Sequence, residues 1–232
     1  MVNRVRVSTR AIEFPASPIR KLNPLADRAK KEGVKVYHVN IGQPDIATPE
    51  EFMKGIKGTD IEVLSYSPSK GIARVIESLV GYYSDQGIDL DSEDIMVTTG
   101  GSEAGLFAFY IVLEQGSEIL IPEPFYTNYR GFAQMTGVEI KPVPTKPENN
   151  FRLPERDKIQ NLITDDTGAF LLTNPSNPTG RVYSGEEIST VKNIVRENNL
   201  FLISDEVYRE FSYGNTAPIS AFNIEDIEER TI

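Results

Sequence analysis

Residues 169–180 read AFLLTNPSNPTG, an apolar stretch of strand length that ends in two Asn-Pro pairs and a Thr-Gly. A strand that is buried on both faces of a sheet is continuously apolar in this way. A proline disfavours the helical conformation in the residue before it, so the chain after the strand takes an extended path. A loop could need the prolines and the glycine for its shape alone, but shape does not explain the two asparagines. The stretch therefore predicts a buried strand followed by a polar, non-helical loop.

Further runs of strand length lie on both sides of this stretch: IMVTT (95–99), EILIP (118–122), VEIKPVP (138–144) and LFLIS (200–204). Helix-length segments alternate with them. From Gly71 to Gly87 the apolar residues follow a helical period, and capping boxes are expected at Thr48–Glu51 and at Ser184–Glu187. Strands that alternate with helices form crossover units, so we expect an α/β fold with a mostly parallel sheet flanked by helices.

Composition excludes several classes of site. The 232 residues carry 34 acids against 24 bases, a formal net charge of -10, which makes nucleic acid a poor partner. The absence of cysteine excludes disulfides and thiolate chemistry. The one histidine, His38, lies in an alternating apolar stretch and is expected to be a strand residue, so we expect no metal site. The sequence has no signal peptide and no membrane-spanning run, which favours a cytoplasmic protein.

Polar segments follow four of the runs: GGSEAG (100–105), EPFYTNY (123–129), NPSNPTG (174–180) and DEVY (205–208). Ligands of an open parallel sheet bind beyond the carboxyl ends of its strands. We therefore expect these four segments to meet at one crevice.

The segment Gly100-Gly101-Ser102 is a candidate anion site, because two glycines admit a close ligand and the following helix presents free N–H groups. A tight turn between a strand and a helix is the alternative interpretation. The glycine spacing matches neither the dinucleotide fingerprint nor the nucleotide P-loop, which disfavours a nucleotide-dependent oxidoreductase.

Asp205 follows the last complete apolar run, where an unpaired carboxylate would be costly. It could cap the next helix, or it could meet a cationic ring nitrogen such as that of pyridoxal phosphate.

Taken together and in order, these motifs resemble the class I and II aminotransferases of the pyridoxal-phosphate aspartate aminotransferase superfamily. The resemblance runs from Ser17-Pro18-Ile19-Arg20 to the C-terminus. It is carried by NIGQPD (40–45), Tyr66 with Gly71, TGGSEA (99–104), PFY (124–126), NPSNPTG and SDEVY (204–208). It implies the large cofactor-binding domain of that fold over residues 49–232, with its C-terminal part missing. Residues 1–48 would form an N-terminal arm and the small-domain side of the site.

The resemblance also implies a role for each matching residue. Gly101, Ser102 and Glu103 match the backbone cradle of the cofactor phosphate, and Tyr126 matches the aromatic residue that stacks on the pyridine ring.

Three residues match the contacts to the polar edge of that ring. Asn177 and Tyr208 match the pair that hydrogen-bonds the phenolic oxygen, and Asp205 matches the carboxylate that keeps the ring nitrogen protonated. Asp205 and Tyr208 are thus the candidate catalytic residues. Gly42 and Asn177 match substrate contacts, and Tyr66 matches a tyrosine that reaches the phosphate in the neighbouring subunit of a homodimer.

The Schiff-base lysine of the family has no counterpart here, because no lysine follows Lys192. The last residues, ERTI (229–232), look like the opening of one more strand, so we expect a fragment that is inactive alone. The expected function of the complete protein is transfer of an amino group from an amino acid to a 2-oxo acid in amino acid metabolism. A lyase of the same superfamily and a non-catalytic, truncated cofactor-binding protein are the alternatives.

Overall fold

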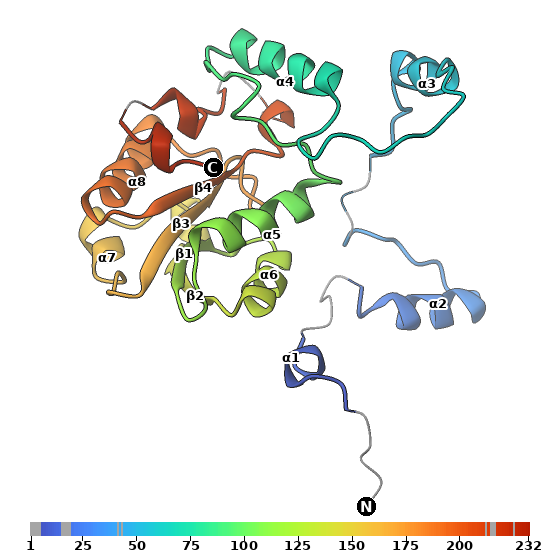
Figure 1. The fold of residues 1–232 in the computed structure, drawn as a ribbon. Coiled ribbons are helices and arrows are strands. Elements are labelled where there is room, and N and C mark those ends of the chain that lie inside the picture. Colours follow the sequence, from blue (N-terminus) through green and yellow to red (C-terminus); the bar gives the residue numbers. More distant parts are fainter. Residues whose placement is uncertain are drawn as a thin grey trace, which may run out of the picture.

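A four-stranded parallel sheet forms the centre of the protein (Figure 1). The computed structural model describes residues 6–14, 20–40, 42, 44–211, 213, 217–224 and 226–232. The strands are β1 (Glu118–Glu123), β2 (Glu139–Pro144), β3 (Thr167–Thr173) and β4 (Phe201–Asp205), in the order β2-β1-β3-β4. All three strand pairs are parallel, which confirms the predicted α/β class and four of the five predicted strands.

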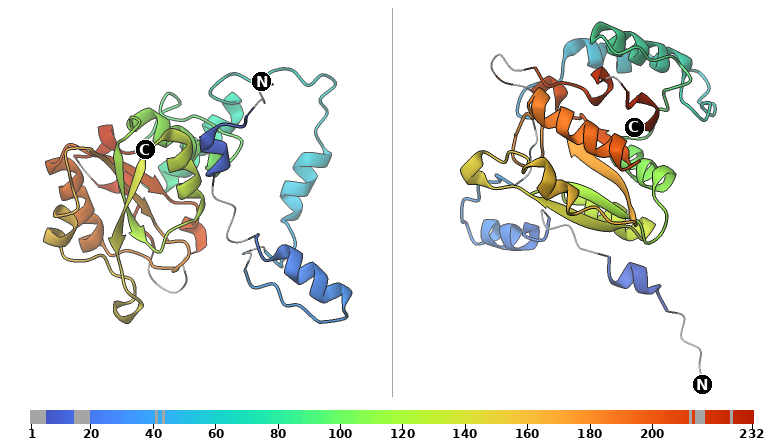
Figure 2. Two further views of the ribbon diagram at one scale, coloured as in Figure 1. Left: turned by 90° about the horizontal axis from the view of Figure 1, so that it is seen from below. Right: turned by 90° about the vertical axis from the view of Figure 1, so that its left-hand side faces the viewer.

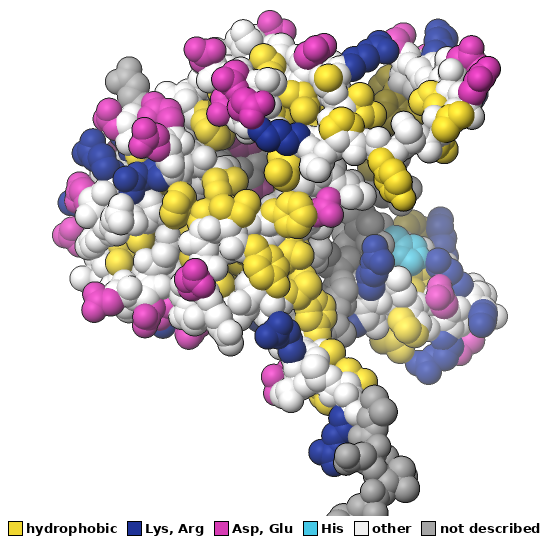
Figure 3. Space-filling model, in the orientation of Figure 1, with side chains coloured by type: hydrophobic (Ala, Val, Ile, Leu, Met, Phe, Trp, Pro, Cys, Tyr) yellow, Lys and Arg dark blue, Asp and Glu magenta, His cyan; other side chains and the backbone are white. Residues whose placement is uncertain are grey.

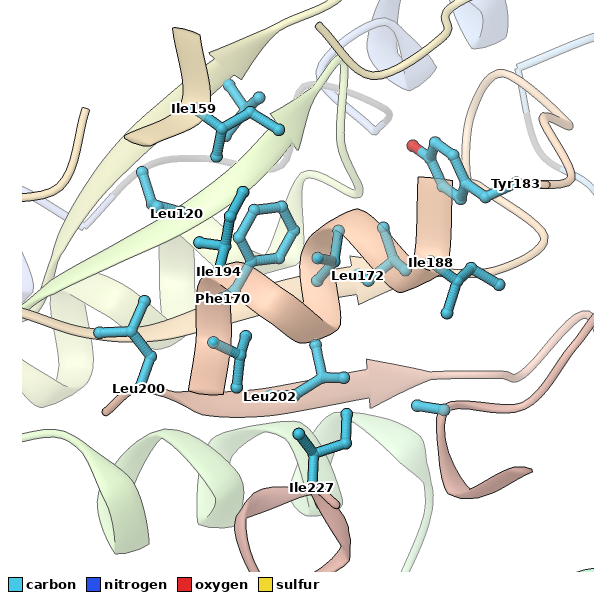
Figure 4. Packing of buried hydrophobic residues seen from close by; sticks show 14 residues of the cluster. Leu120, Ile159, Phe170, Leu172, Tyr183, Ile188, Ile194, Leu200, Leu202 and Ile227 are labelled. Carbon is cyan, nitrogen blue, oxygen red and sulfur yellow. The ribbon is translucent and has the colours of Figure 1, made fainter. Parts of the chain in front are cut away.

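Helices cover both faces of the sheet (Figure 2). On one face lie α7 (Arg156–Gln160) and α8 (Gly185–Glu197), and on the other lie α5 (Gly101–Val112) and α6 (Asn128–Thr136). Neighbouring residues of β3 therefore enter different cores: Phe170 packs with the α8 layer shown in Figure 4, whereas Leu171 packs with α5 and α6. Burial on both faces is the reason why β1 and β3 are largely apolar, whereas the edge strand β2 is mostly exposed or half-buried and carries charged residues.

The helix predicted before residue 87 and one of the two capping boxes are confirmed. The helix is α4 (Ala73–Asp85). At the start of α8, the Ser184 hydroxyl accepts a hydrogen bond from the Glu187 amide, and the Glu187 carboxylate accepts one from the Ser184 amide. The box expected at Thr48 is absent, because α3 (Glu50–Lys57) begins after Pro49 and makes no side-chain cap.

Residues 95–99 were expected to form a strand, and this prediction is wrong for the structure. They form no regular secondary structure, and Val97 donates its N–H to the carbonyl of Lys70 rather than to a strand. A strand needs a neighbour to complete its hydrogen-bond ladder, and none of the described residues supplies one here.

The predicted strand opening is confirmed for its last two residues by a parallel bridge between Thr231 and Leu202 of β4, whereas Glu229 and Arg230 belong to a 3-10 helix. Ile232 donates its N–H to the carbonyl of Leu202 over 2.9 Å and accepts the N–H of Ser204 over 2.8 Å.

The N-terminal segment lies away from the sheet in Figures 1 and 2. Its helices α1 (Thr9–Ile12), α2 (Asn23–Lys31) and α3 bury no residue. His38 is exposed and lies outside any strand, so the strand predicted there is wrong. Short 3-10 helices complete the fold: η1 (Pro147–Asn149), η2 (Arg209–Phe211), η3 (Ala221–Asn223) and η4 (Glu228–Arg230). The division of the chain at residue 48 stays a prediction.

Each helix in the described ranges is too short or too polar to cross a membrane. The same residues contain no cluster of three or more His, Asp or Glu side chains that could hold a metal ion.

Candidate active site

A cavity of about 630 Å³ opens at the carboxyl ends of β3 and β4. The predicted site residues that line it are Gly101, Ser102, Tyr126, Asn177, Asp205 and Tyr208. They come from four segments that are far apart in the sequence. One is the start of α5, and the other three lie at or just after the ends of β1, β3 and β4. The expectation that these segments meet at one crevice is confirmed.

The start of α5 forms one wall of the cavity. The helix begins at Gly101, and the extended Gly100 before it makes no side-chain cap. The first N–H groups of a helix have no partner within it, and the helix dipole places partial positive charge there. The amide of Glu103 is already bonded to the Gly100 carbonyl over 3.0 Å, which leaves the amides of Gly101 and Ser102 as the donors for an anion.

The Glu103 side chain points back to the residues that precede the helix. Its carboxylate accepts the N–H of Thr99 over 2.7 Å, and this bond lowers the pKa of Glu103. Glu103 does not line the cavity and its amide is bonded to Gly100, so its predicted part in phosphate binding stays a prediction.

Asp205 ends β4 with both carboxylate oxygens engaged by neutral donors. Oδ1 accepts the N–H of Val207 over 3.2 Å, and Oδ2 accepts the hydroxyl proton of Tyr129 over 2.5 Å. The first bond closes a turn of the chain, which is close to the capping role considered from the sequence. No lysine or arginine in the described part of the chain pairs with Asp205. Its negative charge is therefore available to a cationic ligand.

Tyr129 is the site residue that the sequence did not single out. Its ring is 3% exposed and lines the cavity, and its hydroxyl lies 2.8 Å from Thr173 Oγ1 at the end of β3. Because its single proton goes to Asp205, Thr173 donates to the Tyr129 oxygen. Burial, the charge of Asp205 and the bond to it raise the pKa of Tyr129 far above 10.0, so the hydroxyl stays protonated. The available signal was its position in EPFYTNY, three residues after Tyr126.

The two residues predicted to hold a phenolic oxygen lie together. Asn177 Nδ2 donates to the Tyr208 hydroxyl over 3.3 Å, and both side chains line the cavity. Tyr126 lines the same cavity, and its ring stands at 89° to that of Tyr129 with 5.5 Å between the ring centroids.

Besides Glu103, two predicted residues do not line this cavity. Tyr66 is fully exposed, and Gly42 is exposed and outside any helix or strand. Their proposed contacts stay predictions, as they concern a neighbouring subunit and a substrate. The matching residues Ser17, Pro18, Ile19, Ile41 and Gln43 lie outside the described residues.

The donor set fits pyridoxal phosphate. The uncapped start of α5 suits its phosphate, and the carboxylate of Asp205 suits a protonated ring nitrogen. An aromatic ring and a polar pair suited to a phenolic oxygen line the same cavity. The volume of the cavity is also in the range of cofactor sites.

Comparison with known proteins identifies the family. Residues 34–231 match the family model described as aminotransferase class I and II. The chain belongs to this family. Class I and II aminotransferases depend on pyridoxal phosphate, which confirms the predicted cofactor.

Relatives of this aminotransferase chain include two curated aspartate aminotransferases. That of Pyrococcus horikoshii is 33% identical over 195 residues, which are 83% of this chain and 49% of that protein. That of Bacillus subtilis is 27% identical over 231 residues, 98% of this chain and 58% of that protein. The chain thus spans roughly half to three fifths of the length of these relatives.

Solved structures of aminotransferases share the fold. The aspartate aminotransferase of Thermus thermophilus with maleate has a TM-score of 0.87 at 26% identity, covering 98% of this chain and 59% of that one. The alanine aminotransferase of Pyrococcus furiosus has a TM-score of 0.87 at 32% identity, covering 96% and 57%.

Proposed function

We propose that the complete protein transfers an amino group from an amino acid to a 2-oxo acid, and that this chain supplies the cofactor-facing part of its site. The observation that carries the proposal is the meeting of three features at one cavity. These are the uncapped start of α5, the Asp205 carboxylate and the Asn177–Tyr208 pair.

In this proposal the chain binds and orients the cofactor. The amides of Gly101 and Ser102 hold the phosphate, and the Tyr126 ring covers one face of the pyridine ring. Bound pyridoxal phosphate supplies an electron sink for the carbanion formed at the alpha carbon of the substrate.

Asp205 holds the proton on the pyridine nitrogen. Tyr129 and the Val207 amide fix the direction of the carboxylate, and both donors are neutral. The charge of the carboxylate is therefore not cancelled before the ligand arrives, which favours the protonated ring. Asn177 and Tyr208 would donate hydrogen bonds to the phenolic oxygen of the cofactor.

We further propose a homodimer, as the resemblance implies. The outward face of α5 exposes Phe107, Tyr110 and Ile111, and Figure 3 shows apolar side chains gathered over that helix. An apolar patch of this kind is typical of a surface that another chain covers. Tyr66, fully exposed here, is the residue proposed to cross to the neighbouring site. The cytoplasmic location stays a prediction.

The proposed reaction is tested with the protein expressed from its complete reading frame. Incubation with pyridoxal phosphate, an amino donor and 2-oxoglutarate should produce glutamate and the 2-oxo acid of the donor in equal amounts. Release of ammonia without glutamate would favour a lyase. A protein that binds pyridoxal phosphate but converts no amino acid would favour the non-catalytic alternative.

A further inference from the structure

The hydroxyl of Tyr126 has a dedicated partner in Asn128. Asn128 Nδ2 donates to the Tyr126 oxygen over 2.7 Å, within one turn of chain at the start of α6. Both side chains are partly buried. An amide that donates to a phenol oxygen holds the far end of the aromatic ring, and this is the end that rotation about the side-chain bonds would displace most.

A second contact fixes the plane of the same ring. Tyr129 packs against Tyr126 at an interplanar angle of 89°, and its own hydroxyl is tied to Asp205 and Thr173. The torsion about the Cβ–ring bond of tyrosine is broad, so a ring held at only one point could still turn. With Asn128 at its tip and Tyr129 against it, the Tyr126 ring is placed relative to the Asp205 carboxylate.

The start of α6 shows that the Asn128 amide is not used for helix capping. The N-cap residue is Thr127, and α6 has no side-chain cap hydrogen bond. Thr127 Oγ1 is buried without a hydrogen-bond partner in the described part of the chain. Asn128 is the first residue of the helix, one position after the N-cap, and its Nδ2 group donates to Tyr126.

We propose that Asn128 is a positioning residue for cofactor binding, which holds the Tyr126 ring in the plane that covers the pyridine ring. This inference rests on the proposed function. It assigns Asn128 a role through Tyr126 and no contact with the cofactor, since Asn128 does not line the cavity.

The test is a double-mutant cycle of Asn128→Ala and Tyr126→Phe in the full chain. The matched control is Asn161→Ala, because Asn161 is an exposed asparagine at the end of α7. Pyridoxal phosphate is titrated, and its affinity and its induced visible circular dichroism are measured. Loss of one hydrogen bond should weaken binding about three- to tenfold in either single variant and reduce the induced signal. The double variant should lose no more than either single one, because both remove the same bond.

If the loss of affinity in the double variant equalled the sum of the losses in the two single variants, the proposal would be contradicted. Asn128 would then act independently of the Tyr126 hydroxyl. Unchanged affinity and dichroism in Asn128→Ala would contradict it as well. If that variant does not fold, Tyr126→Phe, which removes one oxygen atom, carries the test: wild-type binding and dichroism in it would refute the role of the bond.

A readout without cofactor separates this inference from the proposed function. The chain has no tryptophan, so its near-ultraviolet dichroism comes from its 10 tyrosines and 11 phenylalanines. Asn128→Ala should weaken the tyrosine signal of the apo protein while Asn161→Ala leaves it unchanged. If the wild-type chain binds no pyridoxal phosphate, the proposed function fails, and the role of Asn128 in cofactor binding fails with it. The tyrosine signal of the apo protein still shows whether Asn128 holds the Tyr126 ring.

Discussion

Asp205 illustrates how one residue serves both the fold and the proposed chemistry. One carboxylate oxygen closes a turn with Val207, and the other accepts the Tyr129 proton. The sequence predicted Asp205 from its place after an apolar run. It did not predict that Tyr129 would bridge this carboxylate to Thr173, because Tyr129 lies 76 residues from Asp205 and 44 from Thr173 in the sequence.

Asp205→Asn should leave the protein folded, because the amide oxygen can still accept the Val207 N–H and the side chain keeps its size. The neutral group holds the ring proton less firmly, since a charge-assisted hydrogen bond is roughly twice as strong as a neutral one. We expect turnover of the complete protein to fall by orders of magnitude while pyridoxal phosphate still binds. Asp165→Asn, on the exposed surface, is the control. Near-wild-type turnover would show that Asp205 only closes the turn with Val207 and has no part in the reaction.

Tyr129→Phe should destabilise the fold, because it removes a buried hydroxyl that bridges Asp205 and Thr173. We expect the free energy of unfolding in urea to fall by about 1–3 kcal/mol, the usual range for leaving buried polar groups unpaired. The exposed Tyr213→Phe serves as the control and should change it little.

The same substitution should alter the response to alkaline pH. The pKa of Tyr129 is raised in the folded protein, so native Tyr129 keeps a proton that the unfolded chain loses above pH 10.0. The contribution of Tyr129 is therefore fully present below that pH, and stability falls as pH rises beyond it. Tyr183, whose pKa burial raises to about 12, acts in the same direction. Unfolding midpoints measured at rising pH should decline less steeply in Tyr129→Phe, and an unchanged slope would contradict the assigned bond.

At the scale of elements, local signals succeeded where the packing agrees with them. The runs of β1 and β3 became strands that helices bury on both faces, and β2 formed as an exposed edge strand through its pairing with β1. The capping box at Ser184 formed at the start of α8, which packs on the sheet. The run at 95–99 and the stretch around His38 lack a partner strand in the described ranges, so the same local pattern gave no strand there. Strand pairing is a long-range property that a single run does not encode.

The start of α8 should be sensitive to Ser184→Ala. The substitution removes the bond to the Glu187 amide, which costs about 1 kcal/mol in typical N-caps. Chemical unfolding measures the loss, and Ser189→Ala on the exposed side of α8 is the matched control. If both serines gave the same small change, the capping box would not stabilise the helix.

Glu187 in that box should make the fold sensitive to acid. Burial opposes its ionisation, but the N–H groups of Ser184 and Leu153 and the Arg181 guanidinium outweigh burial and lower its pKa. A carboxylate with a lowered folded pKa contributes stability at neutral pH that is lost as pH falls. Glu187→Gln should therefore be less stable than wild type at pH 7, with a difference that narrows in acid. A difference that stays constant would argue against the ionised pair.

For the molecule as a whole, the chain combines a closed core with an open apolar surface. The sheet and its helices bury two compact clusters, whereas α5 exposes Phe107, Tyr110 and Ile111. The position of this surface could not be predicted from the sequence, because a helix that is apolar on several sides does not show which side stays open.

The exposed surface of α5 should drive self-association. Ile111 is 70% exposed, so Ile111→Lys replaces apolar surface with charge at little cost to the fold. Light scattering should show dimers or larger species for the wild-type chain and less association for the variant. Glu114→Lys, on the exposed surface just beyond α5, adds the same residue outside the apolar patch and controls for charge. A wild-type chain that stays monomeric at high concentration would contradict the proposed interface.

The most direct test of the central claim is a crystal structure of the chain with pyridoxal phosphate. The account predicts the phosphate at the amides of Gly101 and Ser102, the ring nitrogen at the Asp205 carboxylate and the Tyr126 ring over the pyridine face. Pyridoxal phosphate bound elsewhere, or bound here with its ring nitrogen away from Asp205, would contradict it.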